Sequence, residues 1–294
     1  MAKWKVIVNR AAGRVPVSVD LVRSVLETVG VEADIETPAT RSEAEETIRA
    51  LALEGASHFA MVGGDGSVSM AANVLLSIEG LEPPVVALLP AGTGCDLLRT
   101  FAIPTDLAGA AAHLVTDTVY PIDVGVLEGS WGTRYFVNVA QVGVGAAAVQ
   151  TAERINRRLG SSRYPMAFAA RLPGFPPTQV TITTERRTYR SRALAVIMAN
   201  GQYFAGGWNV APRATLIDGV LDVQIIDTPK RRAPALVPKV IKGTHLMDRA
   251  VRRFSSGSFA VETDIPWPVE ADGDLVGNTP LSSRVVPAAL RLKI

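Results

Sequence analysis

Gly63-Gly64-Asp65-Gly66-Ser67 follows directly on the apolar run of residues 59–62 and decides the fold. An apolar run, a glycine-rich turn and the start of a helical pattern are typical of a strand that ends in an anion-binding loop. Glycine lets the backbone turn sharply and lets an anion approach the amide groups closely. The stretch is also consistent with a plain tight turn in which Asp65 caps the next helix.

A second glycine-rich stretch, Pro90-Ala91-Gly92-Thr93-Gly94-Cys95-Asp96, follows the apolar run of residues 85–89. Open α/β sheets bind ligands at the carboxyl ends of their parallel strands, so we expect both loops at one edge of a sheet. Each loop contains an acidic residue, which suggests a metal-bound phosphate. Two such loops favour phosphate binding over a plain turn, and the first hypothesis is a nucleotide.

Length and composition limit the classes of protein. The chain has 294 residues, enough for one large or two medium domains, and its 48% hydrophobic and 20% charged residues are typical of globular proteins. A net charge of +2 is too small for strong nucleic-acid binding by bulk charge. The single cysteine, Cys95, excludes an internal disulfide and, with no signal peptide or spanning segment, favours a cytoplasmic protein.

Residues 1–123 alternate strand and helix patterns. Ser42 and Glu45 form a capping-box pattern at the start of one helix. The expected strands are residues 4–8, 33–35, 59–62 and 85–89, and the expected helices are residues 18–29, 42–53, 67–78 and 106–114. This alternation predicts a three-layer α/β domain, a parallel sheet with helices on both faces.

Residues 124–294 change character and predict a second, β-rich domain. The runs are rich in Val, Ile, Thr and aromatic residues and are separated by turn residues. The expected strands are residues 135–141, 179–184, 189–200, 221–226 and 258–262, with helices at 147–158 and 235–242 and a last strand at 289–293 that could pair in either domain. A β-sandwich or a flattened barrel is predicted.

Gly143-Val144-Gly145-Ala146-Ala147-Ala148 fits a dinucleotide-binding fingerprint. That fingerprint needs an acidic residue about twenty positions on, at the end of a second parallel strand. Arg157, Arg158 and Arg163 lie in that region instead, and β-rich sequence follows. We therefore interpret the stretch as a structural turn.

An ordered series of motifs gives a more specific indication. It comprises the two glycine-rich loops, Ala199-Asn200-Gly201-Gln202-Tyr203 with Gly206-Gly207, Ala211-Pro212 followed by Asp218-Gly219-x-Leu221-Asp222, and Asp272-Gly273-Asp274. The series resembles the bacterial diacylglycerol kinase family of soluble lipid kinases, which shares its first domain with NAD kinases and sphingosine kinases. The likeness covers nearly the whole chain, and the later motifs are typical of the lipid kinase branch.

The resemblance implies that ATP binds in the cleft between the two domains. Asn9 and Gly13 match the family's first nucleotide-contacting turn, and Thr37 matches a nucleotide-contacting threonine to within about one residue. The positions implied to bind the nucleotide phosphates are Gly63, Gly64, Asp65, Gly66, Ser67, Gly92 and Thr93.

The resemblance also implies magnesium and a general base. The Asp218 side chain would hold a structural Mg²⁺ with the backbone carbonyls of Thr215 and Val220, although Asp218-Gly219 is also a hairpin-turn pattern. The family's base lies in an Asp-Gly-Glu motif, in which Asp274 takes the glutamate position here. Asp272 is the other candidate, and Asp65 would handle phosphate-bound magnesium and could assist.

Three departures from the family's pattern stand in the nucleotide-binding loops. The first loop continues Ser67-Val68-Ser69-Met70 where the family has Thr-x-Asn-Glu, so a carboxylate is replaced by a thioether. Cys95 replaces an asparagine, and Arg10 replaces a proline after Asn9. A non-catalytic nucleotide-binding protein therefore stays an alternative.

Basic residues point to a membrane surface. Residues 230–253 hold eight Lys or Arg and one acid, Asp248, interleaved with apolar residues, and a second cluster comprises Arg154, Arg157, Arg158 and Arg163. Either is also consistent with a solvated basic face. The function expected is an ATP-dependent lipid kinase that converts diacylglycerol to phosphatidic acid at the inner face of the membrane. A kinase for a sphingoid base or ceramide is the nearest alternative, and a homodimer is left open.

Overall fold

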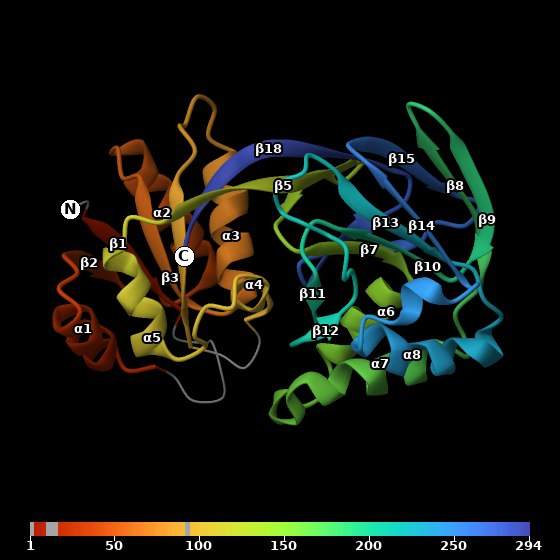
Figure 1. The fold of residues 1–294 in the computed structure, drawn as a ribbon, viewed down its shortest axis with the longest axis horizontal. Coiled ribbons are helices and arrows are strands. Elements are labelled where there is room, and N and C mark those ends of the chain that lie inside the picture. The colour runs from red at the N-terminus through yellow and green to blue at the C-terminus, as the bar shows by residue number, and fades with distance from the viewer. Residues whose placement is uncertain (1–2, 10–16, 92–94) are drawn as a thin grey trace. The chain divides into compact units, whose positions relative to one another are not determined.

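Two strands carry the chain between two units. The computed structural model describes residues 3–9, 17–91 and 95–294; unit 1 is Met1–Asp123 with Ala288–Ile294, and unit 2 is Val124–Pro287. The chain passes from one unit to the other within β5 (Val119–Gly129) and returns within β18 (Leu281–Lys293) (Figure 1). At the return, the Asp123 carboxylate accepts a hydrogen bond from the Ala288 N–H at 2.9 Å, which joins the two boundary segments.

Unit 1 is built on a parallel sheet of short, buried strands. The strands are β1 (Trp4–Val8), β2 (Ala33–Glu36), β3 (His58–Gly63) and β4 (Val85–Pro90). Their order is β2-β1-β3-β4, and Arg291 and Leu292 of β18 pair parallel to β4. All six residues of β4 and five of the six residues of β3 are buried, as expected for a parallel sheet covered on both faces.

Helices cover both faces of this sheet, so the predicted three-layer α/β architecture is confirmed. α1 (Val19–Thr28) and α5 (Leu107–Ala112) pack against one face, where Val22 and Leu26 join a core with alternate strand residues such as Val6. α2 (Arg41–Leu53) and α3 (Asp65–Leu76) pack on the other (Figure 1). The sequence did not predict α4 (Asp96–Thr100), and the helix expected to end at residue 114 ends in a separate 3₁₀ turn, η1 (His113–Val115).

The predicted capping box of α2 is wrong by two residues. Thr40 is the N-cap, and its hydroxyl accepts the Glu43 N–H at 3.1 Å. Glu43 reaches back to the Ala39 N–H at 2.7 Å, whereas Glu45 pairs with Arg41. Both Thr40-x-x-Glu43 and Ser42-x-x-Glu45 satisfy the spacing rule, so spacing alone does not choose between them.

Unit 2 is a β-sandwich, as predicted. Six antiparallel strands form one sheet in the order β14-β13-β10-β7-β16-β17, and the facing sheet contains β18, β15, β8 and β9 with β5 and β6. The inner faces share one core, to which Val142 and Val196 contribute from the first sheet and Ile182 and Val261 from the second. The strands are β6 (Gly132–Phe136), β7 (Val139–Gly143), β8 (Thr178–Thr184), β9 (Thr188–Ala193), β10 (Ala195–Ala199), β11 (Tyr203–Phe204), β12 (Trp208–Asn209), β13 (Leu221–Ile226), β14 (Val251–Ser256), β15 (Ser258–Thr263), β16 (Pro268–Ala271) and β17 (Asp274–Asn278).

Helices lie on the outer face of the six-stranded sheet. They are α6 (Val144–Ala152), η2 (Arg157–Ser162), α7 (Arg163–Arg171), η3 (Lys230–Arg232), α8 (Ala233–Ile241) and η4 (His245–Met247) (Figure 1). α6 begins directly after β7 because Gly143 turns the chain with a φ of 96°. A Cβ on Gly143 would lie 2.5 Å from the Leu194 carbonyl oxygen. No helix in the described ranges is both long enough and apolar enough to span a bilayer.

Two runs expected as single strands are each split in two. The run 135–141 contains the end of β6 and the start of β7, and the run 189–200 contains β9 and β10, which belong to different sheets. Continuous apolar and β-branched sequence does not mark the point at which a chain changes sheet. In the second run that point is Leu194, whose N–H bonds to the Ile226 carbonyl.

Candidate active site

The described residues that were predicted to contact a nucleotide lie at the carboxyl edge of the sheet in unit 1. Val8 of β1 stands opposite Val62, and Gly63 stands opposite Pro90 of β4, so these strands end side by side. Asn9 follows β1 directly, and Thr37 follows β2 as an exposed residue. Parallel strands bind ligands at this edge, because the loops that leave it converge there. Gly13, Gly92 and Thr93 lie outside the described residues.

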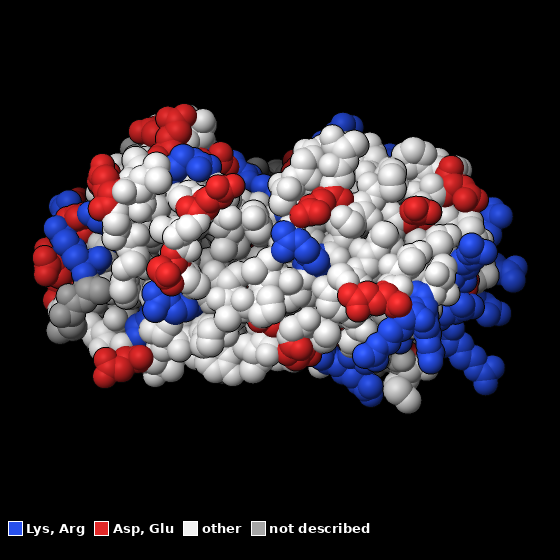
Figure 2. Space-filling model, turned by 90° about the horizontal axis from the view of Figure 1, so that it is seen from above, with Lys and Arg blue, Asp and Glu red and all other residues white. Residues whose placement is uncertain are grey.

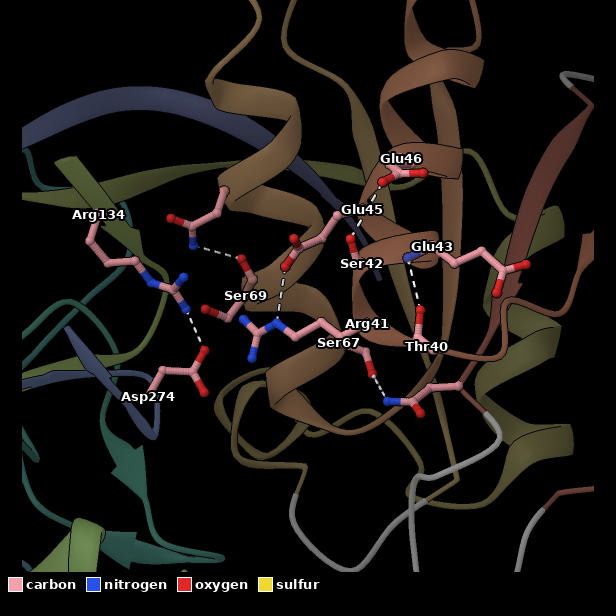
Figure 3. A network of polar contacts seen from close by, with 12 residues as sticks. Thr40, Arg41, Ser42, Glu43, Glu45, Glu46, Ser67, Ser69, Arg134 and Asp274 are labelled. Atoms are coloured by element: carbon pink, nitrogen blue, oxygen red, sulfur yellow. Dashed lines mark hydrogen bonds and ion pairs between the residues drawn. The ribbon is translucent and has the colours of Figure 1, made fainter. Parts of the chain in front are cut away.

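Gly63 makes room for a polar contact between two of these residues. An ideal Cβ on Gly63 would stand 2.2 Å from the Ser67 Oγ, so a side chain there would force the Ser67 hydroxyl to move. The Asn9 amide donates to the Ser67 hydroxyl at 3.2 Å, and Ser67 is buried in the first turn of α3 (Figure 3). Gly64 is the N-cap of α3, and Gly66 has open space around its Cβ position. The loop therefore presents the amino end of α3, where backbone N–H groups and the helix dipole favour an anion.

Asp65 ties the two glycine-rich loops together. Its carboxylate accepts the N–H of Asp96 at 2.8 Å and the N–H of Leu97 at 3.0 Å, one on each oxygen. These are the first N–H groups of α4, so Asp65 caps that helix from a neighbouring strand end. These two hydrogen bonds hold the start of α4, and the role of Asp65 in handling phosphate-bound magnesium stays a prediction.

Two of the departures from the family pattern fall on buried residues. Cys95 is the N-cap of α4, and burial, with the nearby carboxylates of Asp65 and Asp96, raises the pKa of its thiol to about 12. That thiol stays protonated at neutral pH, so it is no reactive nucleophile. Met70 is buried in α3, where its thioether stands in place of the family's glutamate.

In unit 2, Asp272 and Gly273 form a two-residue hairpin between β16 and β17. Their φ angles of 49° and 94° are those of a type I′ turn, which favours Asp-Gly. The Asp272 carboxylate accepts three backbone N–H groups, from Val137 at 2.7 Å, Asn138 at 2.9 Å and Val139 at 3.1 Å. Asp272 thus fastens the hairpin to the segment between β6 and β7, which is the segment that splits the run 135–141.

Asp274, the first residue of β17, has different surroundings. Its carboxylate pairs with the Arg134 guanidinium of β6 at 2.6 Å (Figure 3). The side chain is 36% exposed, whereas that of Arg134 is 18% exposed. A charge-assisted bond of this kind holds a carboxylate in a defined direction while water can still reach it. The two base candidates in the hairpin therefore differ, since Asp274 pairs with a charged side chain and Asp272 holds backbone amides.

Glu270, which the sequence analysis missed, lies beneath the hairpin. It is fully buried in β16, its Oε1 accepts the Gly273 N–H, and Gln141 of β7 stands directly opposite it in the sheet. Burial, reinforced by the charges of Asp272 and Asp274, raises its pKa to about 8. No motif could have identified it, because its partners come from β7 and the turn and depend on strand register.

Other motif residues gather at the same end of the six-stranded sheet. Ala199 at the end of β10 stands opposite both Val139 and Asp222, and the Asn200 amide donates to the Val137 carbonyl at 2.8 Å. A Cβ on Gly201 would stand 2.8 Å from the Asn138 Oδ1. The Ala-Asn-Gly motif therefore packs against the segment that Asp272 holds, which makes its asparagine and glycine structural supports of the hairpin.

The residues expected to hold magnesium lie in the segment before β13. Asp218 is exposed, and its carboxylate accepts the Val220 N–H at 3.3 Å across Gly219, whose φ is 70°. The interpretation of Asp218-Gly219 as a turn therefore agrees with the structure. Within the described ranges, no three His, Cys, Asp or Glu side chains gather as a metal site, so any ion here would depend on one carboxylate and on backbone carbonyls such as that of Thr215.

Two models of known protein families match this chain, one in its first part and one in its second. The model of the diacylglycerol kinase catalytic domain matches residues 3–127. The model of the YegS C-terminal NAD kinase beta sandwich-like domain matches residues 138–294, more than half of the chain. The second match covers the β-sandwich and the Asp-Gly-Asp hairpin.

Individual relatives agree with the family models. A protein of Mycobacterium tuberculosis named diacylglycerol kinase is 30% identical over 91% of this chain and 84% of its own length. A Xanthomonas euvesicatoria protein named "Probable lipid kinase YegS-like" is 26% identical over 99% of this chain and 96% of its own. A crystal structure of a diacylglycerol kinase from Bacillus anthracis has a TM-score of 0.76, with 20% identity over 99% of this chain and 96% of that one. At 20% sequence identity, the similarity to this structure shows a shared fold.

Proposed function

The chain belongs to the diacylglycerol kinase family of lipid kinases, and from this premise we propose that it transfers the γ-phosphate of ATP to the free hydroxyl of diacylglycerol. The products are phosphatidic acid and ADP. In this reaction the hydroxyl oxygen forms a bond to the γ-phosphorus, and the bond from the γ-phosphorus to the β-phosphate bridging oxygen breaks. The hydroxyl proton must go to a base, and a carboxylate can accept it.

The observation that carries the proposal is the difference between the carboxylates of the hairpin. Asp272 accepts three backbone N–H groups and holds the turn, and Asp65 in unit 1 caps α4. Asp274 combines partial exposure with a side-chain partner, Arg134. We therefore assign the general base to Asp274, which takes the hydroxyl proton and returns it to water, and a positioning role to Asp272.

The loops of unit 1 are proposed to bind the ATP phosphates. The amino end of α3 offers the backbone N–H group of Gly66, and the Ser67 hydroxyl and Asn9 amide add polar contacts. Mg²⁺ on the nucleotide supplies neutralisation of the β- and γ-phosphate charge when bound. For the second, structural Mg²⁺, the exposed Asp218 carboxylate with the carbonyls of Thr215 and Val220 fits the ion's preference for oxygen ligands and retained water.

The lipid substrate requires contact with a bilayer, and unit 2 has a surface suited to it. The outer helices carry exposed apolar side chains. They are Leu159 in η2, Met166 in α7, Ile241 in α8 and Met247 in η4. Exposed basic residues flank them, including Lys242 and Arg249. Apolar side chains among basic ones are typical of peripheral contact with anionic lipid. We propose that these helices touch the inner face of the membrane.

Phosphate transfer from labelled ATP with magnesium to diacylglycerol in mixed micelles tests the reaction, with ceramide as a second acceptor. We expect labelled phosphatidic acid from the unmodified protein and a loss of at least about 100-fold in Asp274→Asn, because general-base catalysis contributes about that much or more. Asp264→Asn, an exposed aspartate elsewhere in unit 2, is the matched control and should keep full activity. Transfer to ceramide alone would reassign the acceptor.

Two further outcomes would contradict parts of the proposal. Nucleotide binding without transfer to either lipid would support a non-catalytic protein. Activity that survives Asp274→Asn would move the base to Asp272 or Asp65, and a urea unfolding curve of each variant would separate loss of a base from loss of the fold.

A further inference from the structure

An apolar cavity lies on the outer side of the six-stranded sheet in unit 2. Its volume is about 120 Å³. Its walls come from α6, α7, α8 and the strands β10 and β13, and almost all of the lining is apolar. Ring-bearing residues form part of the wall, with Tyr164 and Phe204 at 6.2 Å between centroids and Trp208 nearby in β12.

The apolar lining is incompletely covered by protein. Phe168, Trp208, Val237 and Val240 line the cavity and are only partly buried, so together they leave apolar area in contact with water. Leaving such area in contact with water is unfavourable, and an apolar ligand would remove the cost. Helix α8 separates apolar from charged side chains. Leu236, Val237 and Val240 line the cavity, whereas Lys239 and Lys242 are exposed to solvent.

One polar side chain in the lining leads to the proposed base. Gln141 of β7 lines the cavity and stands directly opposite Glu270 of β16, whose Oε1 accepts the Gly273 N–H of the Asp272-Gly273-Asp274 hairpin. Gly145 of α6 permits this arrangement, since a Cβ there would stand 2.0 Å from the Gln141 Oε1. An apolar cavity with one polar group near a reacting carboxylate suits a molecule with an apolar chain and a polar end.

The charges around the cavity select the kind of molecule. Arg231, Arg232 and Lys242, at the two ends of α8, are exposed, and the Arg163 guanidinium stacks on the Tyr164 ring at 4.9 Å from its centroid. A basic rim complements the anionic surface of a membrane, which is the source of long apolar chains. We propose that this cavity holds one acyl chain of the acceptor lipid, with its glycerol end directed to Gln141 and the hairpin, an inference that rests on the proposed lipid kinase function.

Binding can be measured without catalysis by the fluorescence of Trp208. A monoacylglycerol whose chain carries bromine atoms should quench tryptophan emission in a saturable way, because bromine quenches only at short range. Among the described tryptophans, Trp208 alone lines the cavity, so Trp208→Phe should abolish the saturable component. Quenching that is absent, or that persists unchanged in Trp208→Phe, would overturn the proposal.

Activity provides a second test, with monoacylglycerols from butanoyl to decanoyl kept below their critical micelle concentrations. Each methylene buried in the cavity should raise kcat/KM about fourfold until the cavity is full. Val237→Trp, which fills the cavity from α8, should lower kcat/KM for the decanoyl acceptor about tenfold or more and leave the butanoyl acceptor nearly unchanged. Ala235→Trp, on the exposed side of the same helix, is the matched control.

The outcomes separate this proposal from the function on which it rests. Phosphate transfer that is independent of chain length and of Val237→Trp would refute the acyl-chain site and leave the lipid kinase function intact. Absence of transfer to every acceptor, with saturable quenching still present, would refute the function and leave a lipid-binding cavity.

Discussion

Glu270 is a carboxyl group that folding removes completely from water. Burial raises its pKa from an ordinary 4.5 to about 8. Between those values the native protein retains a proton that the unfolded chain releases, so the free energy of unfolding decreases as pH rises across this window. The native-state cost reaches at most roughly 5 kcal/mol above the upper value, and below about pH 4.5 the group contributes no pH dependence.

Glu270→Gln should remove that dependence, because an amide does not ionise in this range. The glutamine can still accept the Gly273 N–H, so the hairpin is expected to stay in place. Urea unfolding between about pH 5 and about pH 9 should show a smaller loss of stability in the variant than in the unmodified protein. Glu262→Gln, an exposed residue of β15, is the control, and equal losses in all three proteins would contradict this role for Glu270.

Among single residues, the sequence motifs identified those that stand in loops or turns specified by the local sequence. Gly63, Ser67 and Asp272 were identified from motifs, because each stands in or beside a glycine-containing loop or turn that the local sequence specifies. Arg134 and Glu270 were not, because each contacts the hairpin through strands that are distant in sequence. Register in an antiparallel sheet is set by tertiary packing, and no local pattern specifies it.

Helix α2 offers a direct test at the scale of one element. Thr40 caps it through the Glu43 N–H, while the Ser42 hydroxyl bonds to the Glu46 carboxylate on the helix surface (Figure 3). Loss of an N-cap hydroxyl costs about 1 kcal/mol, so Thr40→Ala should lower the free energy of unfolding by about that amount. Ser42→Ala should change it by less than about 0.5 kcal/mol, and a larger effect of Ser42→Ala than of Thr40→Ala in urea unfolding would restore the original assignment.

The elements that the sequence located well are those of unit 1. Their apolar periods, caps and glycine stops lie close together in the chain, and each strand is followed by the helix that covers it. In unit 2, β16 and β17 were missed, since Pro268–Ala271 and Asp274–Asn278 are short and contain charged residues. Their strand character comes from pairing with each other and with β7, which is a property of the sheet.

For the whole molecule, the distribution of basic residues differs from the one that the sequence suggested. Half of the Lys and Arg residues in 230–253 have polar partners within unit 2, for example Lys239 with Asp248 at 2.6 Å and Arg252 with Asp227 at 3.5 Å. Figure 2 shows Lys and Arg gathered at the end of unit 2 where β8 and β9 lie in Figure 1. β9 contributes Arg190 and Arg192, which are both exposed. In the sequence their alternation is typical of the solvent-facing side of any strand.

These charges and the exposed apolar helices should act together at a membrane. The charges attract an anionic surface over about 8 Å, the Debye length at physiological salt, and apolar side chains then hold the protein by burial. Binding to vesicles that contain phosphatidylglycerol should therefore weaken as salt rises, whereas binding to pure phosphatidylcholine should be weak at every salt concentration. Sedimentation of the protein with vesicles measures both.

Met247 is the apolar side chain whose burial should contribute most, because it is 86% exposed and follows α8 in the 3₁₀ turn η4. Transfer of such a side chain out of water stabilises by about 1.5–3 kcal/mol, so Met247→Glu should lower the vesicle partition coefficient by about tenfold or more. Leu53→Glu changes a residue of α2 in unit 1 that is 69% exposed and should have little effect. If both variants partition like the unmodified protein while salt still weakens binding, the contact is electrostatic alone and the helices of unit 2 do not enter the lipid.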